Sequence, residues 1–319
     1  MDKMTEQIRN LGIVPVVKLD SAKDAIPLAK ALIDGGLPCA EITFRTDAAA
    51  ESIKLVTDEY PEMLVGAGTV TTLAQLESAI KAGATFIVSP GFNPTIVKAC
   101  IDAQIPVFPG CVTPSEIEGA MEFGLKTLKF FPAEQMGGLN VIQALCAPYV
   151  NITFMPTGGV NTSNIVEYLN FPKVIACGGS WMVDPKLIAA GDFESITRIT
   201  REAIATVIGF ELAHVGIECG TDEKVNSVVN LFCSVFGLER KPTTTKVFAG
   251  SMIECGTELP LNKNHIAIST NFIDRAVHQL ESRGIEFLEG SEVRKDGVLQ
   301  AIYLKDDFGG LAVHLLQKK

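Results

Sequence analysis

Short hydrophobic runs alternate with helical patterns along the first two thirds of the chain. Eight of these runs have the length and the β-forming residues of buried strands: 12–19, 40–45, 63–67, 86–89, 106–109, 127–131, 152–156 and 174–176. A helical pattern follows each run, and this alternation is typical of a parallel sheet covered by helices. Eight such units within residues 1–208 predict an α/β fold of the (β/α)8 TIM-barrel class with short loops.

The pattern changes after a helix predicted over 193–208, and the rest of the chain contains a repeat. The tetrapeptide beginning at His214 (His-Val-Gly-Ile) returns at His265 as His-Ile-Ala-Ile. A helical pattern follows each copy, over 225–236 and 272–283, and a glycine-led strand follows each helix. The repeat therefore predicts a second, smaller α+β domain over 209–319, made of two similar modules.

Each module also ends alike. Residues 248–254 line up with 308–314, which places Glu254 opposite His314. The stretch between residues 237 and 248 is short enough for one strand of the first module to be missing.

Composition narrows the class of protein. The 319 residues are 47% hydrophobic and 20% charged, which is enough apolar material for two domains. A net charge of -10 without a basic run argues against a nucleic-acid partner. Eight cysteines without a Cys-x-x-Cys pair favour a reducing cytoplasm. No stretch has the length of a membrane span or the pattern of an export signal, so we expect no membrane partner.

One lysine lies inside a run that otherwise predicts a buried strand. Lys129 follows Leu128 and precedes Phe130, and Pro132 ends the strand soon after it. Burial without a partner anion would disfavour the ammonium form and make the amine a nucleophile toward a ketone. The alternative is a structural lysine whose ammonium reaches water from the strand end. Lys18, at the end of the first predicted strand, is a competing amine that spacing alone does not exclude.

Polar residues at other predicted strand ends suggest the rest of a site. Glu41, Thr43 and Arg45 share one face of the second strand because side chains alternate with a period of two. They could form a plain ion pair, or Arg45 could hold a substrate carboxylate while Glu41 moves protons. Glycines at 158–159 and 178–179 end strands seven and eight, where barrels commonly bind phosphate.

Histidine is absent from the predicted barrel. All four histidines lie beyond residue 208, at His214, His265, His278 and His314. A metal-dependent aldolase needs imidazole ligands and a triad hydrolase needs an imidazole base, so both classes are disfavoured for the barrel. The catalytic groups that remain for the barrel are a lysine and a carboxylate.

Six segments in this order resemble the class I aldolase family that acts on 2-keto-3-deoxy-6-phosphogluconate (KDPG) and 4-hydroxy-2-oxoglutarate (KHG): 41–46, 66–70, 89–91, 129–134, 156–160 and 178–181. The resemblance covers residues 1–208. It implies a metal-free and cofactor-free lyase that forms a homotrimer. The reaction it implies is cleavage of KDPG to pyruvate and glyceraldehyde 3-phosphate in the Entner-Doudoroff pathway, and also of KHG to pyruvate and glyoxylate.

The resemblance also implies roles for single residues. Lys129 would form the Schiff base with pyruvate, and Glu41 would be the general acid and base. The substrate-binding positions would be Arg45 and Thr69 for the carboxylate, Pro90, Phe131 and Thr157 for the pocket wall, and Gly158, Gly159, Gly179 and Ser180 for the phosphate.

The C-terminal repeat resembles the glyoxalase and dioxygenase superfamily, whose vicinal-oxygen-chelate fold pairs βαβββ modules. By that resemblance His214, Glu254, His265 and His314 are candidate ligands of a divalent metal, although the last position usually carries glutamate there. The alternative is a metal-free relative used for binding or assembly, with His278 on a helix surface. For the whole chain, two further alternatives stay open: a non-catalytic sugar-acid sensor, and a bifunctional enzyme with a metal-dependent second activity.

Overall fold

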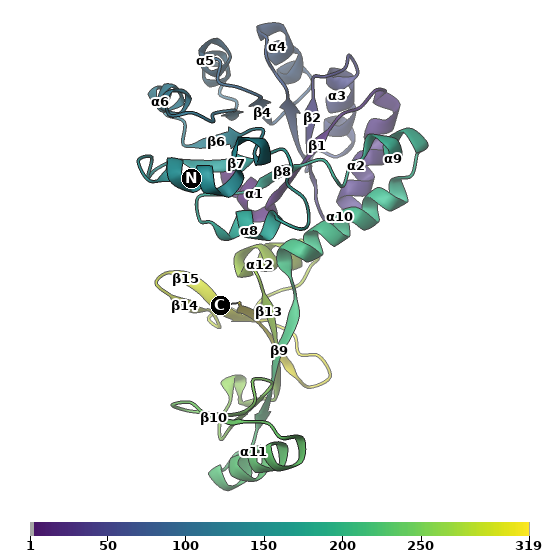
Figure 1. Cartoon of the computed structure of the whole chain (residues 1–319). Coiled ribbons are helices and arrows are strands. Elements are labelled where there is room, and N and C mark those ends of the chain that lie inside the picture. The colour runs from purple at the N-terminus through teal and green to yellow at the C-terminus, as the bar shows by residue number, and fades with distance from the viewer. Residues whose placement is uncertain (1–2, 319) are drawn as a thin grey trace. The chain divides into compact units, whose positions relative to one another are not determined.

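The computed structural model describes residues 3–318, and the chain divides into two compact units (Figure 1). The barrel unit is Met1–Val207 and the C-terminal unit is Ile208–Lys319. Within residues 3–318, none of the helices has both the length and the apolar composition needed to cross a lipid bilayer.

The barrel unit is built on a curled sheet of parallel strands. Its strands are β1 (Ile13–Val17), β2 (Cys39–Thr43), β3 (Leu64–Gly68), β4 (Phe86–Ser89), β5 (Val107–Pro109), β6 (Thr127–Phe130), β7 (Thr153–Pro156) and β8 (Cys177–Gly179). Six of them pair in the order β5-β4-β3-β2-β1-β8, and β6 pairs with β7. Single bridges from Gly110 to Lys129 and from Thr157 to Gly178 join these two parts. The predicted curled parallel α/β sheet is thereby confirmed.

The eighth strand lies later than predicted. The sequence favoured 174–176 because these residues are apolar, but β8 is Cys177–Gly179. Pairing with β1 begins where Cys177 lies opposite Ile13, whereas Val174 makes only an isolated bridge to Phe154. Glycines carry no side chain, so two of the three residues of β8 gave no hydrophobic signal.

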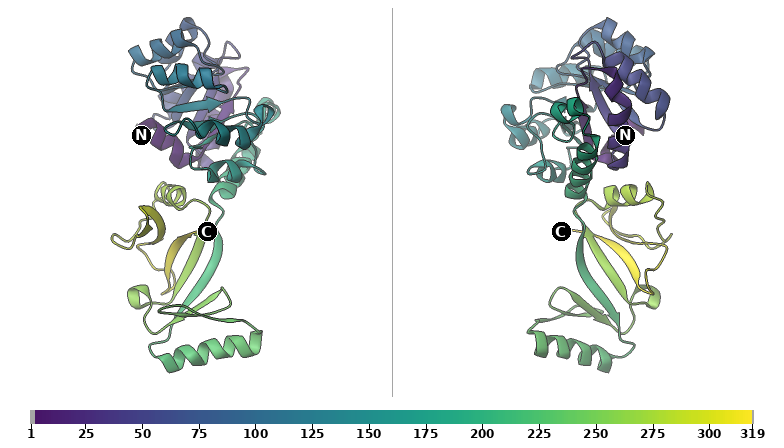
Figure 2. Two further views of the ribbon diagram at one scale, coloured as in Figure 1. Left: turned by 60° about the vertical axis from the view of Figure 1, so that its left-hand side comes forward. Right: turned by 90° about the vertical axis from the view of Figure 1, so that its right-hand side faces the viewer.

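Helices follow the strands and surround the sheet (Figures 1 and 2). They are α1 (Lys3–Leu11), α2 (Ala25–Asp34), α3 (Ala49–Glu59), α4 (Leu73–Lys81), α5 (Pro94–Asp102), α6 (Pro114–Glu122), α7 (Gly138–Cys146), α8 (Ile165–Asn170), α9 (Pro185–Ala190) and α10 (Phe193–Ile208), with short 3-10 turns η1 (Ala22–Asp24) and η2 (Glu134–Met136). Thr72 begins α4 with a capping box that satisfies free N–H groups of the first turn. The helical segment that follows β1 is divided into η1 and α2.

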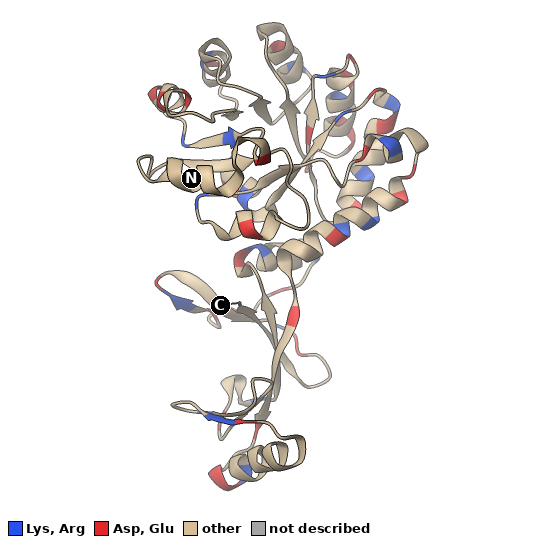
Figure 3. Ribbon diagram, in the orientation of Figure 1, with Lys and Arg blue, Asp and Glu red and all other residues tan. Residues whose placement is uncertain are grey.

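Charged residues of both signs are interspersed along the outer helices of the barrel unit (Figure 3). Several form exposed pairs one helical turn apart, as Lys54 does with Asp58 and Lys98 with Asp102. Such pairs contribute little to stability because water screens them, so the fold depends on its core.

Aromatic rings fill the core of the barrel unit. Phe130 and Phe154 are fully buried and meet edge to face with ring centroids 6.1 Å apart. Gly66 in β3 makes room for Phe86, because a Cβ there would lie 2.1 Å from the ring. Tight packing of this kind fixes the strands that carry the polar side chains.

The C-terminal unit is mostly sheet. Its first half contains β9 (Glu211–Glu218), α11 (Asp222–Phe236), β10 (Arg240–Pro242), β11 (Val247–Ala249) and β12 (Ile253–Gly256), and its second half contains β13 (His265–Thr270), α12 (Ile273–Glu281), β14 (Val293–Lys295), β15 (Val298–Tyr303) and β16 (Ala312–Gln317), with the turn η3 (Pro260–Asn262) between them. The strand order is β10-β11-β12-β9-β13-β16-β15-β14, with β9 antiparallel to β13 (Figure 2).

No strand is missing from the first half. β10 follows α11 directly and pairs with β11, so the expectation that this stretch is too short was wrong. The predicted glycine-led strand was also misplaced: Gly237 caps α11 in a left-handed conformation, and β10 begins at Arg240. A three-residue strand with exposed side chains has no hydrophobic pattern from which it could be predicted.

Candidate functional site

Lys129 and Glu41 meet inside the barrel unit. The Nζ atom of Lys129 on β6 lies 3.1 Å from Oε1 of Glu41 on β2, and the two residues are 5% and 1% exposed. The expectation of a buried amine without a partner anion was therefore wrong. The sequence could not show this contact because 88 residues separate the two positions. The ring of Phe131, itself partly exposed, has its centroid 5.5 Å from the same Nζ atom.

The Glu41 carboxylate fits beside a glycine and has one oxygen without a hydrogen-bond partner. Its Oε2 atom is buried and has no hydrogen-bond partner within residues 3–318. Gly68, at the end of β3, leaves the room for this side chain, because a Cβ there would lie 2.3 Å from Oε1. Buried polar atoms are nearly always paired, so an unpaired carboxylate oxygen beside an amine indicates a place for a substrate group or water.

The other polar residues of strand two form a chain of hydrogen bonds. The Thr43 hydroxyl donates to the carbonyl of Val17 at 2.7 Å and accepts from Nε of Arg45 at 2.9 Å. The alternative of a Glu41–Arg45 ion pair is not what the structure has: Glu41 pairs with Lys129, and Arg45 is exposed beyond the end of β2. Thr43 thus orients the Arg45 guanidinium, whose two terminal nitrogens have no hydrogen-bond partner within residues 3–318.

Thr69 follows β3 in a strained conformation. Its φ angle is 57°, in the left-handed region that a β-branched residue rarely adopts. Such strain persists where surrounding structure holds it, often at functional sites.

The glycines of strands seven and eight serve different purposes. Gly158 and Gly159 have φ angles of 100° and 81°, which L side chains rarely adopt. Gly178 and Gly179 instead make room, because a Cβ would lie 2.2 Å from Oγ1 of Thr157 or 1.8 Å from the ring of Trp181. A side chain at Gly179 would therefore disturb packing before it reached any ligand.

The remaining substrate-binding candidates lie at the same strand ends. Thr157 is buried, and its Oγ1 has no hydrogen-bond partner within residues 3–318. Pro90 is half-buried after β4, and Ser180 is exposed after β8. Lys18, the competing amine, is partly exposed and pairs with Asp20 at 2.7 Å. The structure thus places Lys129, and not Lys18, against Glu41.

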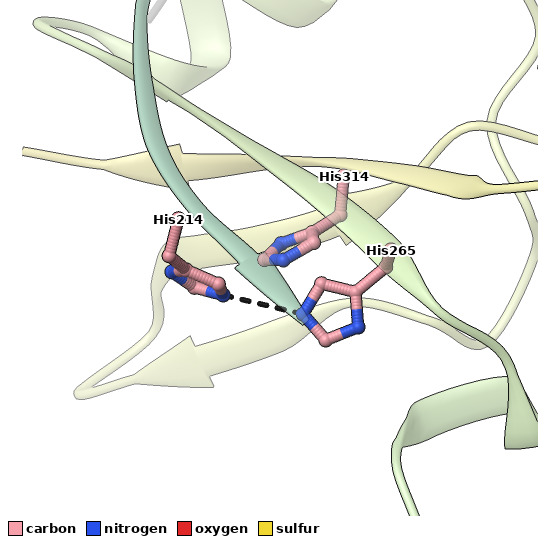
Figure 4. A group of neighbouring side chains, drawn as sticks. All are labelled: His214, His265 and His314. Carbon is pink, nitrogen blue, oxygen red and sulfur yellow. Dashed lines mark hydrogen bonds between the residues drawn. The ribbon is translucent and has the colours of Figure 1, made fainter. Parts of the chain in front are cut away.

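Three histidines of the C-terminal unit point toward one another (Figure 4). His214 on β9, His265 on β13 and His314 on β16 each offer a nitrogen, and these atoms lie within 4.8 Å of one another. His278 lies on α12 and is not part of this group. Gly216 leaves space for the cluster, because a Cβ there would lie 2.2 Å from the His265 ring.

Glu254 on β12 joins the histidine cluster. Its Oε2 atom lies 3.0 Å from Nε2 of His265 and 3.4 Å from Nε2 of His214. Its Oε1 atom lies 2.9 Å from Nζ of Lys246, a contact that the sequence gave no reason to expect. Burial opposes ionisation, but the two imidazoles and Lys246 hold the pKa of Glu254 well below its usual range.

The cluster offers unpaired nitrogen. Nδ1 of His265 and Nε2 of His314 are buried without a partner within residues 3–318, while Nδ1 of His314 lies 3.3 Å from the carbonyl of Leu315. Burial and the neighbouring imidazoles of His265 and His214 lower the pKa of His314 to about 4, so it is neutral near pH 7. The Tyr303 ring stacks on His314 at 4.7 Å and fixes its plane. Three imidazoles beside a carboxylate form a donor set that suits a divalent transition metal.

Comparison with known proteins shows which family the barrel unit resembles. The family model described as KDPG and KHG aldolase matches residues 4–199. The chain belongs to the KDPG and KHG aldolase family.

Relatives in the KDPG and KHG aldolase family match the barrel unit at nearly their full length. The 2-dehydro-3-deoxy-phosphogluconate aldolase of Treponema pallidum is 48% identical over 202 residues, which are 63% of this chain and 96% of the relative. The KHG/KDPG aldolase of Escherichia coli is 42% identical over 200 residues, 62% of this chain and 94% of the relative.

A solved structure agrees with the fold. The KDPG aldolase of Legionella pneumophila, with pyruvate captured as a covalent carbinolamine intermediate, has a TM-score of 0.61 and 34% identity. The match covers 63% of this chain and 98% of that chain. The histidine cluster lies outside the residues 4–199 that the KDPG and KHG aldolase model matches.

Proposed function

We propose that the barrel unit is a class I aldolase that cleaves KDPG to pyruvate and glyceraldehyde 3-phosphate, and that it also accepts KHG. The contact of 3.1 Å between Lys129 and Glu41 carries this proposal, because Schiff-base chemistry needs an amine with a proton acceptor beside it. The names of the Treponema and Escherichia relatives and the carbinolamine of the Legionella enzyme support it.

The mechanism follows from the two side chains. Glu41 takes a proton from the Lys129 ammonium, and the free amine attacks C2 of the substrate ketone. Glu41 returns its proton to the carbinolamine hydroxyl, which leaves as water and gives an iminium. The iminium accepts the electron pair of the C3–C4 bond as Glu41, ionised again, removes the proton of the C4 hydroxyl. The aldehyde leaves, the enamine is reprotonated at C3, and water releases pyruvate and restores Lys129.

The surrounding residues would orient the substrate. Arg45, held by Thr43, and Thr69 bind the carboxylate, and Pro90, Phe131 and Thr157 line the pocket. The unpaired Thr157 hydroxyl supports this role. Backbone amides at Gly158, Gly159, Gly179 and Ser180 bind the phosphate. Support comes from Gly159, whose amide donates no hydrogen bond within residues 3–318.

Borohydride trapping tests the proposed function. Reduction in the presence of pyruvate should add one covalent adduct on Lys129, located by mass spectrometry. An adduct on Lys18 would contradict the assignment. Binding of KDPG without release of pyruvate would favour the alternative of a sugar-acid sensor.

We also propose that the histidine cluster holds one divalent transition metal, with His214, Glu254, His265 and His314 as ligands. The unpaired Nε2 of His314 favours this over a purely structural cluster. Protein purified without a histidine tag should contain about one metal ion per chain. The double variant His265→Ala, His314→Ala should contain none, and metal that survives in it would refute the site.

We propose further that the barrel unit forms a homotrimer, as its resemblance to this aldolase family implies. The relatives are covered to 94–96% by the barrel unit, which supports its folding alone. Light scattering should give a trimer for the full chain and for the chain truncated after Gly209. A monomer after truncation would assign assembly to the C-terminal unit.

A further inference from the structure

The glycine loop after β7, defined as Gly158 and Gly159, is held on one side by two asparagines. The carbonyl of Gly159 accepts hydrogen bonds from Nδ2 of Asn161 at 3.1 Å and from Nδ2 of Asn164 at 3.2 Å. The backbone N–H of Asn161 donates to Oδ1 of Asn164, and that of Ser163 donates to Oδ1 of Asn161. Because a backbone N–H can only donate, these bonds fix the amide nitrogens of both side chains toward Gly159.

This arrangement decides which backbone groups of the glycine loop are available. The Gly159 carbonyl is occupied by the asparagines, whereas the amide of Gly159 has no acceptor within residues 3–318. A backbone N–H group left free in such a turn can donate to an anion. The loop can do this only while its two left-handed residues keep their conformation.

Glu134 holds the glycine loop on another side. Its backbone N–H donates to the carbonyl of Gly158 at 3.1 Å. Its aliphatic stem covers Gly159, because a Cβ built on Gly159 would lie 2.3 Å from Cγ of Glu134. The Glu134 side chain is exposed, so without an anchor it would be free to turn into water.

Tyr168 supplies that anchor. Its hydroxyl donates to Oε1 of Glu134, and the tyrosine is only 2% exposed on α8. Burial and the adjacent Glu134 carboxylate raise the pKa of Tyr168 above its usual range, so the phenol keeps its proton. Asn164 is the N-cap residue of the same helix. One short helix therefore supports the glycine loop at two points.

We propose that Tyr168 and Glu134 are positioning residues of the phosphate subsite. The tyrosine hydroxyl holds the glutamate stem against Gly159, and the stem keeps the loop amides directed at the phosphate of the substrate. The inference rests on the phosphate role proposed above for Gly158 and Gly159. Both side chains would act through the loop, since their described contacts lead to Gly158 and Gly159.

Tyr168→Phe tests the proposal because it removes only the hydroxyl and adds no charge. We expect KM for KDPG to rise about three- to tenfold, with kcat nearly unchanged. This is the loss of affinity that corresponds to the net contribution of one hydrogen bond. KM for KHG, which has no phosphate, should not change. Inhibition by inorganic phosphate should weaken by the same factor as KM for KDPG rises.

Glu134→Gln is the matched control. Glutamine keeps both the stem and an oxygen that accepts from Tyr168, so KM for KDPG should stay close to that of the wild type. A KM that falls in Glu134→Gln would mean that the carboxylate mainly repels the phosphate, and this would overturn the proposal.

Two other outcomes would also overturn it. An equal rise of KM for KDPG and KHG in Tyr168→Phe would show general support of the fold, and no change in either would show that the loop needs no anchor. Failure of the proposed function looks different. In that case the wild type itself would show no Lys129 adduct with pyruvate, or no preference for KDPG over its unphosphorylated analogue.

Discussion

The barrel site and the histidine cluster are built by the same device. In each, buried ionisable side chains from separate strands meet, and a glycine on the neighbouring strand makes the room. Gly68 on β3 leaves space for Glu41, and Gly216 on β9 leaves space for His265. In each, a lysine lies within 3.1 Å of the carboxylate.

The two sites differ in which atoms remain unpaired. In the barrel site these are oxygens, Oε2 of Glu41 and Oγ1 of Thr157, which can exchange hydrogen bonds and protons with an organic substrate. In the histidine cluster they include imidazole nitrogens of His265 and His314, whose lone pairs suit a metal. The comparison teaches that the unpaired atoms, rather than the charges, distinguish the chemistry that each site can perform.

The largest expected effect is that of Lys129→Ala. We expect kcat to fall by several orders of magnitude, because the variant loses covalent catalysis and not merely a contact. Steady-state assays of pyruvate release measure this, and metal content should not change. Lys18→Ala is the matched control and should keep nearly full activity, since Lys18 pairs with Asp20 outside the site. An inactive Lys18→Ala with an active Lys129→Ala would reverse the assignment.

Glu41→Gln should have the next largest effect. It keeps the size of the side chain but removes the proton acceptor, so we expect a loss of about 10²- to 10⁴-fold in kcat. Borohydride should still trap pyruvate on Lys129, more slowly than in the wild type. Turnover near the wild-type rate would mean that another group or a water moves the proton.

A pair of glycine variants sharpens the comparison of the two sites. Gly68→Ala should displace the Glu41 carboxylate and lower kcat by about 10²-fold, the expected cost of misplacing a catalytic group by about 1 Å. Gly216→Ala should displace His265 and weaken metal binding while leaving kcat unchanged. Kinetics and metal titration of both variants are required. If both variants lost kcat, or if both lost metal binding, the two units would not be independent.

The smallest expected effect is that of Lys246→Met. Removing the ammonium leaves the buried Glu254 with less compensation, so the metal-free protein should lose about 1–3 kcal/mol of unfolding free energy. A bound divalent ion would supply the missing charge, so added Zn²⁺ should raise the melting temperature more in this variant than in the wild type. Lys246→Arg should behave like the wild type. If Zn²⁺ raised the melting temperature equally in the wild type, Lys246→Met and Lys246→Arg, Lys246 would have no role in the metal site.

The sequence by itself determined the local elements. Apolar runs, helical patterns and the repeat of a histidine tetrapeptide predicted most strands and helices within a few residues, because these signals lie in neighbouring positions of the chain. Phe86–Ser89 and Phe193–Ile208 have the predicted bounds. Prediction failed at β8 and β10, where glycines or exposed polar residues carry no hydrophobic pattern.

Only the tertiary structure decided which polar groups meet. The partner of Lys129 lies 88 positions away, and strand alternation gives the face of each side chain but not its neighbour across the barrel. The same holds for Tyr168 on Glu134, which no local motif joins. Lys246 reaches Glu254 because the antiparallel pairing of β11 with β12 brings the two residues together. Residue type and spacing indicated the candidate residues. Their contacts depend on the curvature of the sheet and on the space left by glycines, and these two features depend on the packing of the entire unit.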